Sequence, residues 1–85
     1  MKRSTRDITV DLYVLGKPGE LLKRDHLIPA QSLIVEEAGT WRAGENGQSD
    51  TIMVRGKVGG TLVTCTLALD ALESVDGRNQ PYPTF

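Results

Sequence analysis

His26 and Cys65 are the only histidine and the only cysteine of this sequence, and both residue types can serve acid–base or nucleophilic chemistry. A histidine titrates near neutral pH, but neighbouring residues of a strand point to opposite faces, so Asp25 is not placed to orient it. We therefore expect a surface or hydrogen-bonded histidine. Cys65 alternates with Val63 and Leu67 in an apolar row, which predicts a small buried hydrophobic residue rather than an exposed, activated nucleophile.

Sequence motifs that carry catalysis or bind cofactors are missing. There is no Gly-x-Ser-x-Gly elbow and no glycine-rich phosphate loop, and residues 46–50 lack the spaced acidic ligands of a calcium loop. One cysteine and one histidine cannot supply the ligands of a structural zinc site. We expect no catalytic residue, no metal and no cofactor. A small enzyme that joins His26 to a carboxylate across a subunit interface is our third hypothesis.

Trp41 is the strongest candidate for a binding residue. It is the single tryptophan and lies between Gly39 and the Gly- and Asn-containing segment 43–50, which has the composition of an exposed loop. Tryptophan and arginine are enriched at the energetic centres of interfaces, and Arg42 adjoins Trp41. Two interpretations stay open: a lid packed over the core, or an anchor at an interface. Tyr13, Tyr82 and Phe85 are weaker candidates for the same role. The segment 81–85 could dock in an extended form on a neighbouring subunit, and a disordered tail is the alternative.

Lys23 and Arg24 form a possible basic patch together with the positive charges of residues 1–6. The patch comes without regularly spaced aromatic residues for base stacking. The chain has a formal net charge of −1, whereas nucleic-acid-binding domains usually carry a basic excess. We expect a solvated face here, and nucleic acid is a possible but unfavoured partner.

The length of the chain, 85 residues, predicts a single domain with a thin margin of stability. A lone cysteine excludes an internal disulfide, so self-association is the expected route to extra stability. The charged start and the absence of a long apolar stretch argue against a signal peptide or a membrane span. With one unpaired cysteine, these features predict a cytoplasmic protein.

The clearest structural signal is a β-hairpin centred on a Gly-Gly pair at 59–60. Segments 51–58 and 61–69 alternate apolar and polar residues on either side of it. A type I′ turn needs positive φ at both central positions, which glycine accepts. This turn sets a register in which Val54 opposes Cys65 on the inward face.

A second turn is predicted where Pro18 and Gly19 follow an alternating segment. Lys17-Pro18-Gly19-Glu20 fits a type II turn. The strand after it alternates poorly, which indicates an edge position, a bulge or strong bending. The remaining pattern predicts strands at 8–15, 20–27 and 32–37, a short strand or loop at 40–42, and a 3₁₀ turn near 70–72 that feeds a closing strand at 72–75.

Together these elements predict an all-β fold, a small antiparallel barrel of five to six strands. We expect a flexible arm at 1–6, a single β domain at 7–76 and an extended tail at 77–85. The strand pattern of 8–37 and of 61–75 resembles the small β-barrels of the Sm-like and SH3-like type. That resemblance implies a ring-shaped oligomer that binds RNA, although no RNA-contacting residue matches position by position.

Our leading hypothesis is a non-enzymatic binding module that self-associates and recognises a protein or a small ligand. It rests on the lack of a catalytic set, the small core and the position of Trp41 in a loop. An Sm-like RNA-binding protein is the alternative.

Overall fold

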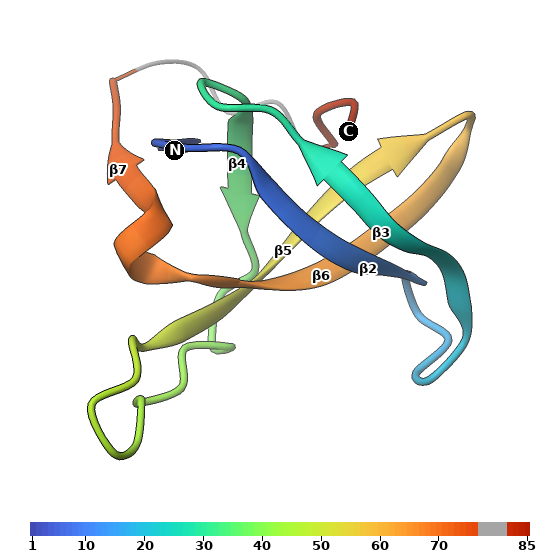
Figure 1. Cartoon of the computed structure of the whole chain (residues 1–85). Coiled ribbons are helices and arrows are strands. Elements are labelled where there is room, and N and C mark those ends of the chain that lie inside the picture. The colour runs from blue at the N-terminus through green and yellow to red at the C-terminus, as the bar shows by residue number, and fades with distance from the viewer. Residues whose placement is uncertain (77–81) are drawn as a thin grey trace.

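The computed structural model describes residues 1–76 and 82–85, and within them the chain is all-β, as its alternating pattern predicts (Figure 1). Seven strands and one 3₁₀ turn make up the regular structure of these residues, which form no α-helix. All pairings between the strands are antiparallel. In chain order the elements are β1 (Lys2–Ser4), β2 (Ile8–Val14), β3 (Leu21–Ile28), β4 (Leu33–Glu36), β5 (Thr51–Val58), β6 (Thr61–Ala68), the 3₁₀ turn η1 (Leu69–Ala71) and β7 (Leu72–Ser74).

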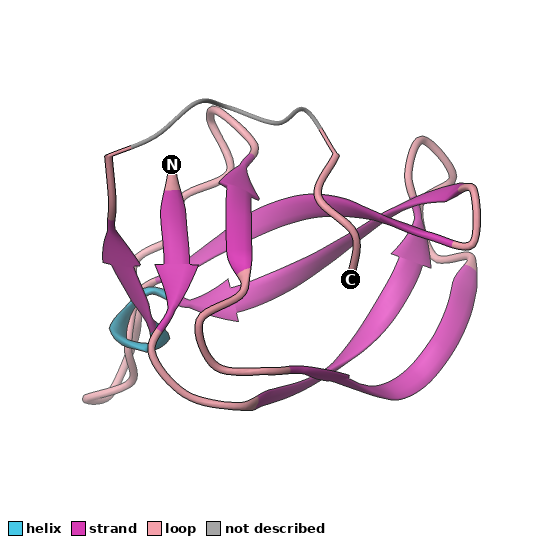
Figure 2. Ribbon diagram, turned by 90° about the horizontal axis from the view of Figure 1, so that it is seen from above, coloured by secondary structure: helices cyan, strands magenta, loops and turns pink. Residues whose placement is uncertain are grey.

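The strands form one strongly curved sheet in the order β3-β2-β6-β5-β4-β1-β7. β4 connects the strands β3, β2, β6 and β5 with the strands β1 and β7. Its residues Leu33 and Ile34 pair with β1, whereas Val35 and Glu36 pair with β5. Figure 2 shows the short strands β4, β1 and β7 side by side at one end of the molecule. Among the described residues β3 and β7 end this order without pairing with each other, so closure into a barrel stays a prediction, and the strand count exceeds the predicted five or six.

Side chains from both ends of the strand order pack into one core. Ile28 of β3, Leu12 of β2 and Ile34 of β4 are fully buried in the same cluster, and Leu72 of β7 packs against it. The side chains on the concave face of the curved sheet therefore pack against one another. This packing removes their apolar surface from water. The other buried members of the core are Ile52, Val54, Val63, Cys65 and Leu67.

The β5–β6 hairpin forms as the sequence predicts. Gly59 and Gly60 have φ values of 54° and 88°, as a type I′ turn requires. Val54 pairs with Cys65 and Ile52 with Leu67. The predicted register and the inward row are thus confirmed, and Cys65 is only 3% exposed.

The turn between β2 and β3 also matches its prediction. The Glu20 N–H donates to the carbonyl of Lys17 at 3.1 Å, and Gly19 has a φ of 80°. These are the hydrogen bond and the positive φ of a type II turn.

β3 is an edge strand and it is irregular, as its poor alternation indicates. Its pairing with β2 shifts register on both sides of Leu12. At one shift Asp25 takes a φ of 52°, and its N–H donates to the Asp11 carboxylate at 3.1 Å. A charged, bulged edge resists pairing with another strand, so these irregularities protect the molecule from edge-to-edge aggregation.

The predicted flexible arm at 1–6 is wrong for residues 2–4, which form β1 between β4 and β7. Ser4 explains the difference: it is fully buried, its hydroxyl donates to the carbonyl of Pro29 at 2.8 Å, and it accepts from the N–H of Ser32 at 2.9 Å. Arg3 adds an ion pair of 2.6 Å with Glu73. Backbone hydrogen bonds to β4 and β7 therefore hold β1 in place, although its sequence lacks the alternation of apolar residues that predicts a strand.

The last residues of the chain are part of the extended tail predicted at 77–85. Residues 77–81 of the predicted tail lie outside the described residues. Residues 82–85 lie against β5, where Thr84 forms a parallel bridge with Lys57. The 3₁₀ turn and closing strand that precede them are confirmed, with the turn one residue earlier than predicted.

Candidate binding surface

The convex face of the sheet carries a row of side chains across four strands. Tyr13 of β2 pairs with Thr64 of β6, Thr64 with Arg55 of β5, and Arg55 with Val35 of β4. Directly paired residues share one face of a sheet. This row therefore lies on the face opposite to Val54 and the core.

A groove of about 400 Å³ runs over this face. The Glu37 N–H donates to the carbonyl of Met53 at 2.9 Å, which holds Glu37 against β5. The Thr64 hydroxyl donates to the carbonyl of Val54 at 2.8 Å, so its proton is already used. The groove offers a ligand an aromatic ring, a thioether, a threonine hydroxyl and a carboxylate. Its lining includes Tyr13, Pro18, Gly19, Glu37, Met53 and Thr66.

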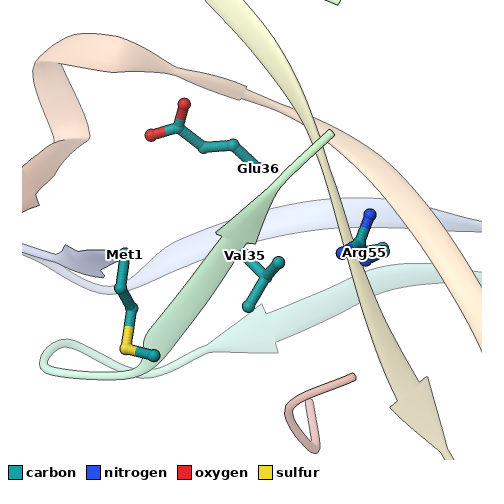
Figure 3. Close-up of a pocket in the computed structure, with 4 residues that line it drawn as sticks. All are labelled: Met1, Val35, Glu36 and Arg55. Atoms are coloured by element: carbon teal, nitrogen blue, oxygen red, sulfur yellow. The ribbon is translucent and has the colours of Figure 1, made fainter. Parts of the chain in front are cut away.

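A smaller hollow of about 250 Å³ lies at β4 and β5, and Met1 and Val35 are part of its lining (Figure 3). Two charged residues, Glu36 and Arg55, complete its described lining. Glu36 Oε1 lies 3.4 Å from the Lys2 ammonium, and the Arg55 guanidinium lies 5.6 Å from the centre of the Tyr82 ring. Both charges already have partners within the chain, so this hollow is a weaker candidate than the groove.

Trp41 is 54% exposed, so the interpretation of it as a lid over the core is wrong. It lies in the loop between β4 and β5, and the residues on both sides of it are held by hydrogen bonds. The Thr40 hydroxyl donates to the carbonyl of Glu37 at 2.7 Å and accepts from the N–H of Met53 at 3.1 Å. Arg42 exchanges two backbone hydrogen bonds of 2.9 Å with Thr51. An exposed tryptophan on a fixed backbone suits an interface anchor, although neither Trp41 nor Arg42 lines the groove.

His26 lies on β3 opposite Val10, away from the groove. Both ring nitrogens are shielded from solvent and have no hydrogen-bond partner among the described residues. Burial, and then the charge of Lys23, lowers the pKa of His26 below its ordinary value. The expected surface or hydrogen-bonded histidine is thus wrong in detail: the ring is half-buried and unpaired within the described chain. An enzyme site at a subunit interface stays a prediction.

Cys65 has a pKa raised to about 12 by burial. Its thiol is therefore protonated at neutral pH and is not a nucleophile. The residues that the structure describes bring no three His, Cys, Asp or Glu side chains into a cluster able to hold a metal ion.

Sequence reasoning missed Pro18, Glu37 and Met53 as members of the groove. The hairpin register does place Met53 beside Thr66 on one face. The missing information was the pairing of β2 with β6, which brings Tyr13 to that face from far along the chain. Of the predicted site residues, the groove contains Tyr13 alone. The others lie on β3 (Lys23, Arg24 and His26), in the β4–β5 loop (Trp41 and Arg42) and in the segment 82–85 (Tyr82 and Phe85).

No protein-family model matches this chain, and neither the curated proteins nor the solved structures contain a significant match to it. In the part of the chain that the structure describes, no helix has the length and apolarity needed to cross a lipid bilayer.

Proposed function

We propose that this protein is a non-enzymatic binding module whose ligand site is the groove over β2, β6 and β5. The observation that carries the proposal is the grouping of Tyr13, Pro18 and Met53 around about 400 Å³ of open space. Concave, mostly apolar surfaces with a few polar groups are the usual form of binding sites.

The chemistry of the lining favours an extended, apolar protein segment that carries a basic residue. Tyr13 and Met53 offer an aromatic and a thioether surface that adapt to apolar side chains. Glu37 is the one charged side chain of the described lining, so a lysine or arginine of the ligand would complement it. A small ligand of the same character is the other occupant to test.

Panning a random linear peptide library against the chain tests the groove. Truncation of an anchor residue typically costs at least about 2 kcal/mol, roughly thirtyfold in Kd, so we expect Tyr13→Ala to weaken a selected peptide by that factor. Thr9→Ala is the matched control, because Thr9 is exposed on the same strand but outside the groove. Selected peptides that bind Tyr13→Ala as well as the unaltered chain would overturn the proposal.

Self-association is part of the same proposal. It is supported by large apolar side chains left in solvent, among them Leu27 of β3, which is 51% exposed, and Trp41. Light scattering at high micromolar concentration tests it, and we expect a mass of at least two chains. A clean monomer would count against association while leaving the groove untouched.

We include in the proposal closure of the sheet into a small barrel and a cytoplasmic setting. Closure is supported by hydrogen bonds that tie the β3–β4 connection to β1: the Gln31 N–H donates to the carbonyl of Ser4 at 2.9 Å, and the Ser4 N–H to the carbonyl of Ser32 at 3.0 Å. A reducing compartment is supported by the unpaired, buried Cys65.

Binding of single-stranded RNA, as in the Sm-like proteins, is a second candidate with one observation in its favour. Lys23 and Arg24 are exposed next to each other on β3. Asp25 and Asp11 adjoin them and offset part of their charge. Titration with single-stranded RNA at two salt concentrations is decisive, because binding through phosphates must weaken as salt rises. No binding at low salt would remove this candidate.

A further inference from the structure

The edge of β5 beyond its pairing with β4 offers a place for another strand. β4 pairs with β5 only through Val35 and Glu36, and its first half turns away to pair with β1. The backbone groups of Lys57 lie past that point. An unpaired strand edge is a template for an added strand.

Residues 82–85 occupy this edge (Figure 1). The Lys57 N–H donates to the carbonyl of Pro83 at 2.9 Å, and the Phe85 N–H donates to the carbonyl of Lys57 at 3.0 Å. Thr84 is the parallel bridge partner of Lys57. This arrangement is strand addition, a mode in which extended peptides bind to sheet edges.

Gly56 creates the space that the added segment fills. A Cβ atom at this position would lie 2.8 Å from the Cε2 and Cζ atoms of Phe85 and 2.8 Å from the carbonyl oxygen of Pro83. Tyr82 adds a second aromatic contact through its ring beside the Arg55 guanidinium. The edge therefore has side-chain preferences: an aromatic residue over Gly56, and another one at Arg55.

We infer that this edge of β5 is a docking site that the segment 82–85 of a second copy of the chain can enter. The contacts described above are made between residues 55–57 and residues 82–85. Residues 82–85 of a second copy can make the same contacts with residues 55–57 of the first copy. The inference rests on the proposed self-association and names the segment that is exchanged. The segment of the same chain competes at a high effective concentration, so exchange grows with protein concentration.

Mixing two single-substitution variants tests the exchange. Lys57→Cys and Thr84→Cys chains of different mass are combined at high concentration under mild oxidation. Because these positions pair across the edge, we expect a disulfide-linked dimer containing one chain of each mass. Cys65 is buried and does not compete. Lys17→Cys, exposed in the β2–β3 turn, replaces Thr84→Cys in the control mixture and gives the background of random cross-linking.

Gly56→Ala added to the Lys57→Cys chain supplies the second arm. The new methyl group excludes Phe85 from the edge but leaves the strand pairing intact, so we expect the mixed dimer to fall by about tenfold. A mixed dimer no more abundant than the Lys17→Cys background, or one that Gly56→Ala does not reduce, would overturn the exchange. Association seen by light scattering without this cross-link would leave self-association standing and place its interface elsewhere.

Discussion

Cys65 lies directly opposite Val54 in the β5–β6 ladder, and both side chains face the core. The thiol therefore occupies an apolar row in which a hydroxyl would have no partner. We expect Cys65→Ser to lower the free energy of unfolding by about 1–3 kcal/mol, the usual effect of leaving a buried polar group unsatisfied. Urea unfolding measures this change. Thr66→Ser, an exposed neighbour on the same strand, should stay within about 0.5 kcal/mol; equal effects of the two substitutions would contradict the inward row.

The same burial predicts the reactivity of the thiol. A pKa of about 12 leaves almost no thiolate at neutral pH, and the thiolate is the reactive form. We expect a thiol-specific disulfide reagent to leave folded Cys65 unmodified and to react with it once urea unfolds the chain. Fast modification of the folded protein would show that β6 opens locally or that Cys65 faces solvent.

The hairpin was predictable because turn chemistry and alternation agree over a short stretch of chain. A two-residue turn at Gly59 and Gly60 determines which residues of the two strands lie opposite each other. The inward position of Cys65 can therefore be derived by counting from the turn. The groove was not predictable in this way. It depends on Tyr13 pairing with Thr64, and the residues between these two positions contain no local signal for that contact.

β1 was missed for a different reason. The three residues of β1 include no apolar side chain, so the strand has no alternating pattern. It is held by backbone pairing to β4 and β7 and by the buried hydroxyl of Ser4. Local sequence preference does not encode such tertiary stabilisation. The sequence supports two interpretations of Trp41, because one aromatic residue beside a loop has the same local sequence whether it is covered or exposed.

The hydrogen bonds of Ser4 predict a measurable role for β1. Ser4→Ala removes the acceptor of the Ser32 N–H and the donor to the carbonyl of Pro29. We expect a loss of about 1–3 kcal/mol in the free energy of unfolding, because buried backbone groups are left unsatisfied. Thr5→Ala is the matched control, since Thr5 is exposed and bonds to Ala71 through its backbone N–H. If Ser4→Ala were as stable as Thr5→Ala, the hydrogen bonds of the Ser4 hydroxyl would contribute nothing to the stability of the fold.

The half-buried ring of His26 predicts how stability depends on pH. Its pKa in the folded protein is lowered from 6.5 by burial and by Lys23, so the unfolded chain binds the proton more tightly than the folded chain does. The stability that neutral His26 contributes is therefore fully present above pH 6.5 and is lost as the pH falls through the folded-state pKa. Carboxylates titrate mostly at lower pH, so the effect is separable from theirs.

Urea unfolding between about pH 5 and about pH 8 tests this dependence. In the unaltered chain we expect the free energy of unfolding to rise with pH up to about pH 6.5 and to level off above it. His26→Gln, which cannot titrate there, should flatten the rise. Lys23→Gln removes the second cause of the shift and should reduce the pH dependence in part, because burial remains the larger cause. A dependence that survives His26→Gln unchanged would assign it to other groups and would mean that His26 reaches solvent in the folded protein.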